Sequence, residues 1–144
     1  MIRLKSHHFI DKATKKRRGK RKTPEYDFHC EVADTLDKIL NPNLTCWSSV
    51  ENSNHTGGIS GMIKQGKDKR KGVKSGFPDI VILYNGTCLC IELKATKGVI
   101  SDSQDLFHKK IISSGNRIEV VRSLTDLVMV LCVHQVPTLV REYI

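Results

Sequence analysis

Residues 78–94 read PDIVILYNGTCLCIELK, and this stretch decides the fold of the chain. It contains two runs rich in β-branched and aromatic residues, joined by Asn85-Gly86. Asn-Gly is the pair that most favours a two-residue type I′ turn between antiparallel strands. The stretch therefore predicts a β-hairpin that turns at Asn85-Gly86.

The position of the turn also predicts which residues face one another. Tyr84 should pair with Thr87, and counting outward brings Asp79 opposite Glu92. Opposed side chains share a face with β-carbons about 4.5–5.5 Å apart, and Lys94 follows two residues later on the same strand and face. The hairpin should therefore gather two carboxylates and an ammonium group at its open end.

Asp79, Glu92 and Lys94 together indicate metal-dependent hydrolysis of a phosphodiester. Facing carboxylates repel each other, especially between apolar strands, and a divalent cation removes that repulsion. Oxygen ligands suit Mg²⁺ or Mn²⁺, which also bind phosphate oxygens. Lys94 can orient or deprotonate the attacking water and offset charge on the phosphate. The alternative is that Asp79 caps a strand while Glu92 and Lys94 form an exposed ion pair, which leaves their convergence unexplained.

Two helices are marked by their capping residues. Thr23-Pro24 suits the start of a helix over about residues 24–40, because Thr caps well and Pro fits the first helical position. Ser101 and Gln104 form a capping-box pattern that should start a helix over about residues 102–114. Both helices carry apolar residues at helical spacing, so each should pack one face against a sheet.

The remaining elements are shorter. Ser123 is expected to cap a last helix that turns Leu127, Val128 and Leu131 inward. Short strands are expected at residues 45–50 and 118–121, and residues 51–76 show no clear period. The elements follow the order αβββαβ with a further helix. This order predicts an α/β fold with a central mixed sheet flanked by helices.

Positive charge is concentrated at the start of the chain. Residues 1–24 hold ten Lys and Arg against one acid, whereas residues 25–144 are balanced at fourteen of each sign. We expect residues 1–23 to be a basic arm and residues 24–144 to be a single domain, the usual number for 144 residues. A solvated tail or a localisation signal is the alternative for the arm.

Two basic groups are candidates for contact with nucleic-acid phosphates. The first belongs to the arm and comprises Lys15, Lys16, Arg17, Arg18, Lys20, Arg21 and Lys22. The second precedes the hairpin and comprises Lys64, Lys67, Lys69, Arg70, Lys71 and Lys74. A solvated loop is the alternative for the second group.

Other classes of protein are disfavoured by composition. No apolar run is long enough to span a membrane, and the N-terminus lacks the pattern of a secretory signal, so a cytoplasmic protein is expected. The five cysteines are odd in number and include no C-x-x-C pair, which favours a reducing compartment. We expect Cys88 and Cys90 to be small buried residues and not zinc ligands.

The order of motifs resembles a known family. Gly76-Phe77-Pro78-Asp79, twelve intervening residues and Glu92-Leu93-Lys94 are similar to the signature of the PD-(D/E)XK nucleases. Ser101 and Gln104, then Gly115, then Val120-Val121-Arg122-Ser123 narrow the resemblance to the VRR-Nuc branch, over about residues 24–131. The resemblance implies a restriction-endonuclease-like core.

The resemblance also implies roles for individual residues. Asp79, Glu92 and the main-chain carbonyl of Leu93 would hold the metal, while Lys94 would activate water. A glutamate on the first helix would add a metal or water contact, with Glu25 as the first choice and Glu31 as the alternative. Gln104 would take part in catalysis by contacting the metal ligands without touching the metal, or by facing the substrate. The alternative is that it serves only as a capping residue of its helix.

The activity implied by the resemblance is that of a structure-specific DNA endonuclease. Standalone members of the family, typically phage-encoded, are similar to enzymes of DNA repair and recombination that resolve four-way (Holliday) junctions as homodimers. One alternative is a restriction- or exonuclease-like enzyme acting on linear DNA. Another is a non-catalytic nucleic-acid-binding module, against which the intact Asp79, Glu92 and Lys94 argue.

Overall fold

The computed structural model describes residues 24–50 and 58–139. The expected basic arm at residues 1–23 therefore lies outside the described residues. It includes Thr23, which was predicted to cap the first helix. The elements are α1 (Pro24–Ile39), β1 (Thr45–Ser49), α2 (Ile59–Arg70), β2 (Ile80–Tyr84), β3 (Thr87–Leu93), α3 (Asp102–Ser113), β4 (Arg117–Val121) and α4 (Leu124–Val133). No helix of the described ranges is long and apolar enough to cross a membrane.

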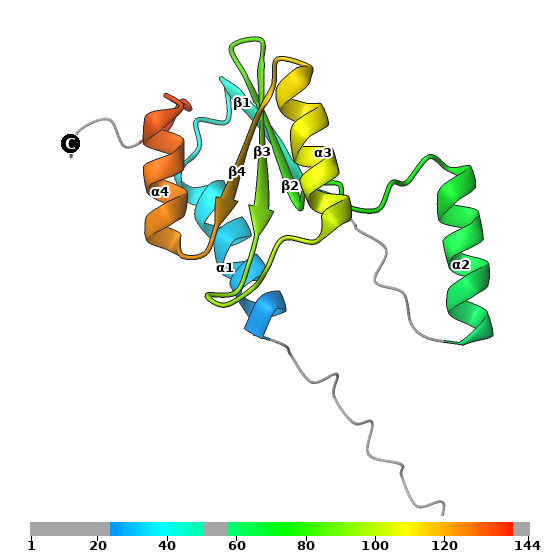
Figure 1. Cartoon of the computed structure of the whole chain (residues 1–144). Helices are drawn as coiled ribbons and strands as arrows, with labels where there is room; N and C mark the ends of the chain where they lie inside the picture. The colour runs from blue at the N-terminus through cyan, green and yellow to red at the C-terminus, as the bar shows by residue number, and fades with distance from the viewer. Residues whose placement is uncertain (1–23, 51–57, 140–144) are drawn as a thin grey trace, which may run out of the picture.

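The strands form one four-stranded sheet in the order β1-β2-β3-β4. The pairs β1/β2 and β2/β3 are antiparallel, whereas β4 runs parallel to β3. The chain passes from β3 to β4 through α3, since parallel neighbours need a crossover connection (Figure 1). The predicted α/β fold with a mixed sheet is confirmed.

The hairpin has the predicted register. Tyr84 pairs with Thr87, and the ladder continues to Ile80 opposite Ile91. Asn85 and Gly86 have φ values of 47° and 71°, the positive values that a type I′ turn requires. The residues just beyond this ladder are Asp79 and Glu92, so the turn chemistry sets where the two carboxylates meet.

One face of the sheet carries the apolar core. The core residues on this face alternate along β2 and β3, although every β3 residue from Leu89 to Leu93 is buried. Helices α1 and α4 cover this face with further apolar residues. The core residues are Val32, Leu36, Leu40, Ile80, Ile82, Tyr84, Leu89, Ile91, Leu93, Val121, Leu127, Leu131 and Val136. The prediction for α4 is wrong at Val128, which is 49% exposed. A residue next to Leu127 lies about 100° further round the helix, away from the Leu127–Leu131 face.

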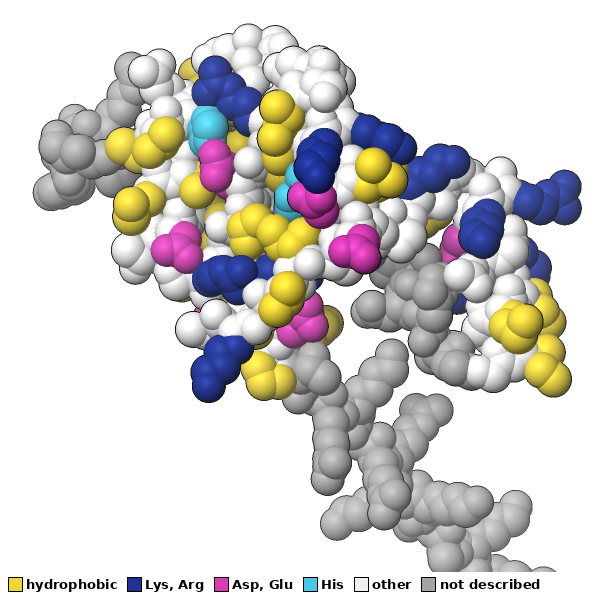
Figure 2. Space-filling model, viewed as in Figure 1, with side chains coloured by type: hydrophobic (Ala, Val, Ile, Leu, Met, Phe, Trp, Pro, Cys, Tyr) yellow, Lys and Arg dark blue, Asp and Glu magenta, His cyan; other side chains and the backbone are white. Residues whose placement is uncertain are grey.

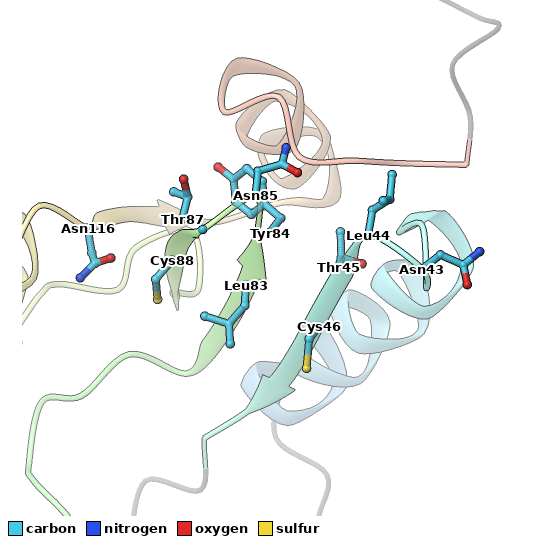
Figure 3. A pocket seen from close by; sticks show the side chains of 11 residues that line it. Asn43, Leu44, Thr45, Cys46, Leu83, Tyr84, Asn85, Thr87, Cys88 and Asn116 are labelled. Carbon is cyan, nitrogen blue, oxygen red and sulfur yellow. The ribbon is translucent and has the colours of Figure 1, made fainter.

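The opposite face of the sheet is covered in part by α3 (Figure 1). Across β1, β2 and β3 a row formed by Cys46, Leu83 and Cys88 stays at least partly exposed on this face. Together with the turn residues, this row lines a shallow cavity of about 550 Å³ (Figure 3). The five cysteines are free. Cys90 is buried as predicted, whereas the prediction is wrong for Cys88, which is only half-buried because it lies in the part of this face that α3 leaves open.

Helix α2 was not predicted from the sequence. It stands apart from the sheet and the other helices (Figure 1), and its apolar residues Ile59, Met62 and Ile63 are exposed, Met62 by 72%. Their spacing of three and four residues is a helical signal, but Gly61 and Gly66 weaken it. Figure 2 shows Lys and Arg side chains around this helix and apolar side chains gathered at one end.

Candidate active site

A cavity of about 230 Å³ lies where β2 begins and β3 ends. It brings together residues from α1, the segment before β2, the end of β3 and the start of α3. The lining residues are Glu25, Ser75, Gly76, Phe77, Asp79, Glu92, Lys94, Ser101, Ser103 and Gln104. The cavity therefore contains every side chain that the sequence placed at the catalytic centre, with Glu25 as the first-helix glutamate.

Asp79 is tied to the neighbouring strands on both sides. Its main-chain carbonyl accepts a hydrogen bond of 2.7 Å from the N–H of Val50. Its carboxylate Oδ2 accepts one of 2.9 Å from the N–H of Leu93, the residue between Glu92 and Lys94. The Asp79 carboxylate is thus held against the end of β3 by the fold itself.

Glu92 is the buried charged residue of the site, with only 1% of its surface exposed. Its Oε1 lies 3.1 Å from Lys94 Nζ and accepts a short hydrogen bond from Gln104 Nε2. Its Oε2 is buried without a hydrogen-bond partner among the described residues. A buried polar atom is normally satisfied, so this oxygen has capacity for a ligand.

The buried position of Glu92 changes the pKa of its carboxyl group. Burial raises its pKa to about 7 from an ordinary value of 4.5, and the negative charge of Asp79 adds to the rise. The hydrogen bond and charge of Lys94 act in the opposite direction, and Glu25 makes a smaller unfavourable contribution. A divalent cation beside Oε2 would favour the ionised form, so these residues fit a metal ion.

Lys94 and Gln104 form the other half of the site. The Lys94 ammonium group, 13% exposed, donates to Gln104 Oε1 at 3.0 Å as well as contacting Glu92. The same Oε1 accepts a 3.0 Å hydrogen bond from the Ser101 N–H, completing the predicted capping box of α3. Gln104 is therefore both the N3 residue of the capping box, in which Ser101 is the N-cap, and a direct neighbour of the catalytic candidates.

Comparison with known proteins found a matching family model and a similar solved structure. A family model for the VRR-NUC domain matches residues 29–124, more than half of the chain. The chain belongs to the VRR-NUC family. A solved structure named "VRR_NUC domain protein" has a TM-score of 0.58 and 16% identity, covering 81% of this chain and 93% of that one. At that identity the likeness shows the fold alone.

Membership confirms the resemblance noted in the sequence. A VRR-NUC domain implies a divalent-metal nuclease of the PD-(D/E)XK type with DNA as its substrate. The matched range contains Asp79, Glu92, Lys94 and Gln104, whereas Glu25 precedes it. A comparison with curated proteins found no match.

The two glutamates proposed as first-helix ligands, Glu25 and Glu31, differ in their position relative to the cavity. Glu25 lines the cavity from the first turn of α1, whereas Glu31 is exposed and does not line it. His29 faces β1 instead, with Nε2 2.9 Å from Ser49 Oγ. Among the described residues, no three His, Cys, Asp or Glu side chains cluster closely enough to hold a metal by themselves. The assignments of Asp79, Glu92, Glu25 and the main-chain carbonyl of Leu93 as metal ligands stay predictions.

The described basic residues that were predicted to bind nucleic acid do not line this cavity. Lys64, Lys67, Lys69 and Arg70 are exposed on α2, and Lys71 and Lys74 are exposed on the segment that follows. Lys74 directly precedes Ser75, which lines the cavity. The seven basic residues between Lys15 and Lys22 lie outside the described residues.

Sequence reasoning did not find several residues that shape the site. Phe77 packs edge-to-face on Phe107 of α3, with ring centroids 5.7 Å apart. Arg122 donates through one guanidinium nitrogen to the carbonyls of Ala95 at 2.9 Å and Gly98 at 2.8 Å. These contacts hold the segments on either side of the cavity, and both Phe77 and Arg122 lie within motifs that carried the family resemblance.

Proposed function

We propose that this VRR-NUC protein is a metal-dependent endonuclease that cuts DNA at branched structures such as four-way junctions. The observation that carries the proposal is the meeting of Asp79, Glu92 and Lys94 in one cavity, with a buried oxygen of Glu92 left without a partner among the described residues. Carboxylates that converge beside a lysine suit hydrolysis of a phosphodiester assisted by a divalent cation.

The metal would be held by Asp79, by Glu92 and by the main-chain carbonyl of Leu93. Glu25 would contact a water on the metal from α1, since these three carboxylates, all among the described residues, do not cluster closely enough to hold an ion by themselves. Oxygen ligands of this kind select Mg²⁺ or Mn²⁺. Bound there, the ion supplies Lewis acidity toward a phosphate oxygen and lowers the pKa of water. The hydrogen bond from Leu93 N–H to Asp79 supports the proposal, because it fixes one carboxylate before any ion binds.

Lys94 is the residue that positions the attacking water and offsets the charge of the phosphate. Its ammonium group is held by Glu92 Oε1 and Gln104 Oε1, which fixes its position at the cavity wall. From there it orients the attacking water and offsets negative charge that develops on the phosphate. Gln104 contributes by fixing both Lys94 and Glu92.

Capture of DNA is proposed to depend on the basic arm and on the lysines of α2 and the segment after it. Contacts between Lys or Arg and phosphates give affinity that falls with salt and carries no sequence information. The exposure of Lys64, Lys67, Lys71 and Lys74 supports this role. Chemistry and capture would then be carried out by separate parts of the chain.

We further propose that the active form is a homodimer. Resolution of a four-way junction takes two symmetric nicks, and a twofold dimer supplies two equivalent sites. The exposed apolar residues of α2, Ile59, Met62 and Ile63, give such a dimer surface to bury.

A single assay tests the activity. The protein is incubated with end-labelled four-way junction, flap, linear duplex and single strand, each with Mg²⁺, Mn²⁺ or EDTA. We expect cleavage of the junction with metal and none in EDTA. Binding without cleavage under every condition would leave a nucleic-acid-binding module, and faster cleavage of linear duplex would replace junction specificity with a restriction- or exonuclease-like activity.

A further inference from the structure

The main chain of Gly76 lies directly against the first turn of α3. A β-carbon built on Gly76 would fall 2.5 Å from the carbonyl carbon of Ser103 and 2.8 Å from the amide nitrogen of Gln104, with the Ser103 oxygen closer still. All three atoms belong to the backbone, so no flexible side chain can swing aside to make room. Any side chain at residue 76 must push the segment before β2 away from α3.

The atoms that Gly76 approaches are those that place Gln104. Gln104 sits in the first turn of α3, and its side chain bonds Lys94 Nζ at 3.0 Å and Glu92 Oε1. Gly76 is also joined through two residues to Asp79. The close approach therefore sets the spacing between the chain that carries Asp79 and the helix turn that holds Lys94 and Glu92.

We propose that Gly76 is a positioning residue for catalysis, whose missing side chain lets α3 bring Gln104 onto Lys94 and Glu92. This inference rests on the proposed nuclease function and adds to it a residue at the cavity wall that has no side chain and acts through Gln104. The mechanism is steric, because a side chain at residue 76 would displace the backbone of Ser103 and Gln104. Since Gln104 is hydrogen-bonded to Lys94 and Glu92, its displacement would move both side chains.

The chain offers a matched control for the backbone conformation. Gly76 has φ +84°, which side chains rarely adopt, so alanine there introduces strain as well as a clash. Gly72 has φ +87°, and nothing lies within 4 Å of where its β-carbon would be. Gly72→Ala thus reproduces the strain without the clash, and it lies outside the catalytic cavity.

The first experiment compares these variants on labelled four-way junction with Mn²⁺. Gly76→Ala should lower kcat about 10- to 100-fold, as expected for a small misplacement of catalytic groups, with little change in KM. Gly72→Ala should keep the kcat of the unmodified protein. Equal kcat values for the two variants, at matched thermal unfolding temperatures, would overturn the proposal.

A double-mutant cycle tests whether the effect passes through Gln104. Gln104→Ala alone should lower kcat at least as far as Gly76→Ala does, and adding Gly76→Ala to it should bring little further loss. This arm stands even if Gly76→Ala folds poorly, because an unchanged kcat in Gln104→Ala overturns the route by itself. Two losses that multiply would overturn it as well.

A readout without cleavage separates this inference from the proposed function. In ¹⁵N-labelled protein the side-chain amide resonances of Gln104 should shift in Gly76→Ala and stay in place in Gly72→Ala. If the unmodified protein cuts none of the DNA substrates but the amide shifts, the nuclease proposal fails and the steric link stands. If the amide of Gln104 does not move, the positioning role is wrong.

Discussion

The carboxylate of Asp79 accepts a 2.9 Å hydrogen bond from the main-chain N–H of Leu93. This bond joins the residue before β2 to the residue that separates Glu92 from Lys94, so the geometry of the site is tied to the geometry of the hairpin. Asp79 therefore accepts a hydrogen bond from the backbone, and under the proposed function it has a second task as a charged metal ligand.

The two tasks of Asp79 are separable by substitution. Asp79→Asn keeps an acceptor for Leu93 N–H but loses the charge, whereas Asp79→Ala loses both. We expect both variants to lower Mn²⁺ affinity by at least about 100-fold in titration calorimetry, since a ligand is removed. Only Asp79→Ala should also lower the unfolding temperature. Wild-type Mn²⁺ affinity in Asp79→Asn would remove Asp79 from the ligand set.

Stability of the metal-free protein should fall as pH rises. The pKa of Glu92 is about 7 when folded and 4.5 ordinarily, so the folded state prefers the protonated form. The contribution of Glu92 to the free energy of unfolding is fully present below pH 4.5. It is lost progressively as the pH rises to about 7, by about 3 kcal/mol in all. Urea unfolding in EDTA at pH 5 and pH 8 measures the loss.

Glu92→Gln is the control for that pH dependence. The amide keeps the size of the side chain but does not titrate, so this variant should lose less stability between pH 5 and pH 8 than the parent protein. Added Mn²⁺ should restore stability at pH 8 in the parent and not in the variant. Identical pH profiles for the two proteins would show that Glu92 is not the titrating group.

Lys94 should matter for chemistry and not for capture of DNA. Lys94→Met keeps most of the chain length but removes the ammonium group that contacts Glu92 and Gln104. We expect cleavage to fall by about 100-fold or more, as for loss of a general acid–base group, while the Kd for four-way junction in Ca²⁺ stays within a few-fold. A parallel fall in affinity would make Lys94 a binding residue instead.

The basic residues should show the converse behaviour. Deleting residues 1–22, or changing Lys64, Lys67 and Lys71 to Ser, should weaken junction binding and flatten its salt dependence by about 0.9 units of log–log slope for each phosphate that the variant no longer binds. Cleavage at saturating DNA should persist. Lys109→Ser serves as the control, because Lys109 is exposed and paired with Asp105 on α3. A wild-type salt slope in the deletion variant would leave the arm without a role in binding.

Local sequence signals predicted the parts of the fold that are built from neighbours in the chain. Asn85-Gly86 predicted the register, and the register predicted that Asp79 and Glu92 meet. Ser101 and Gln104 predicted the start of α3 and left both roles of Gln104 open. In each case the interaction that decides the structure lies within a few residues or across one turn.

Contacts between segments that are distant in the chain could not be predicted from the sequence. The approach of Gly76 to Ser103 depends on how the segment before β2 meets α3, which no spacing pattern encodes. Helix α2 was missed because it packs little of its apolar surface and is interrupted by glycines. Val128 was placed inward because apolar character alone does not say which face of a helix meets the core.

The most direct test of the central claim is a denaturing gel of end-labelled four-way junction after incubation with the parent protein or Asp79→Asn, each with Mn²⁺ or EDTA. The proposed function predicts paired nicks for the parent protein with Mn²⁺ and intact strands in the other three lanes. Nicks that persist in EDTA or in Asp79→Asn, or intact junction in all four lanes, would contradict a metal-dependent nuclease built on Asp79, Glu92 and Lys94.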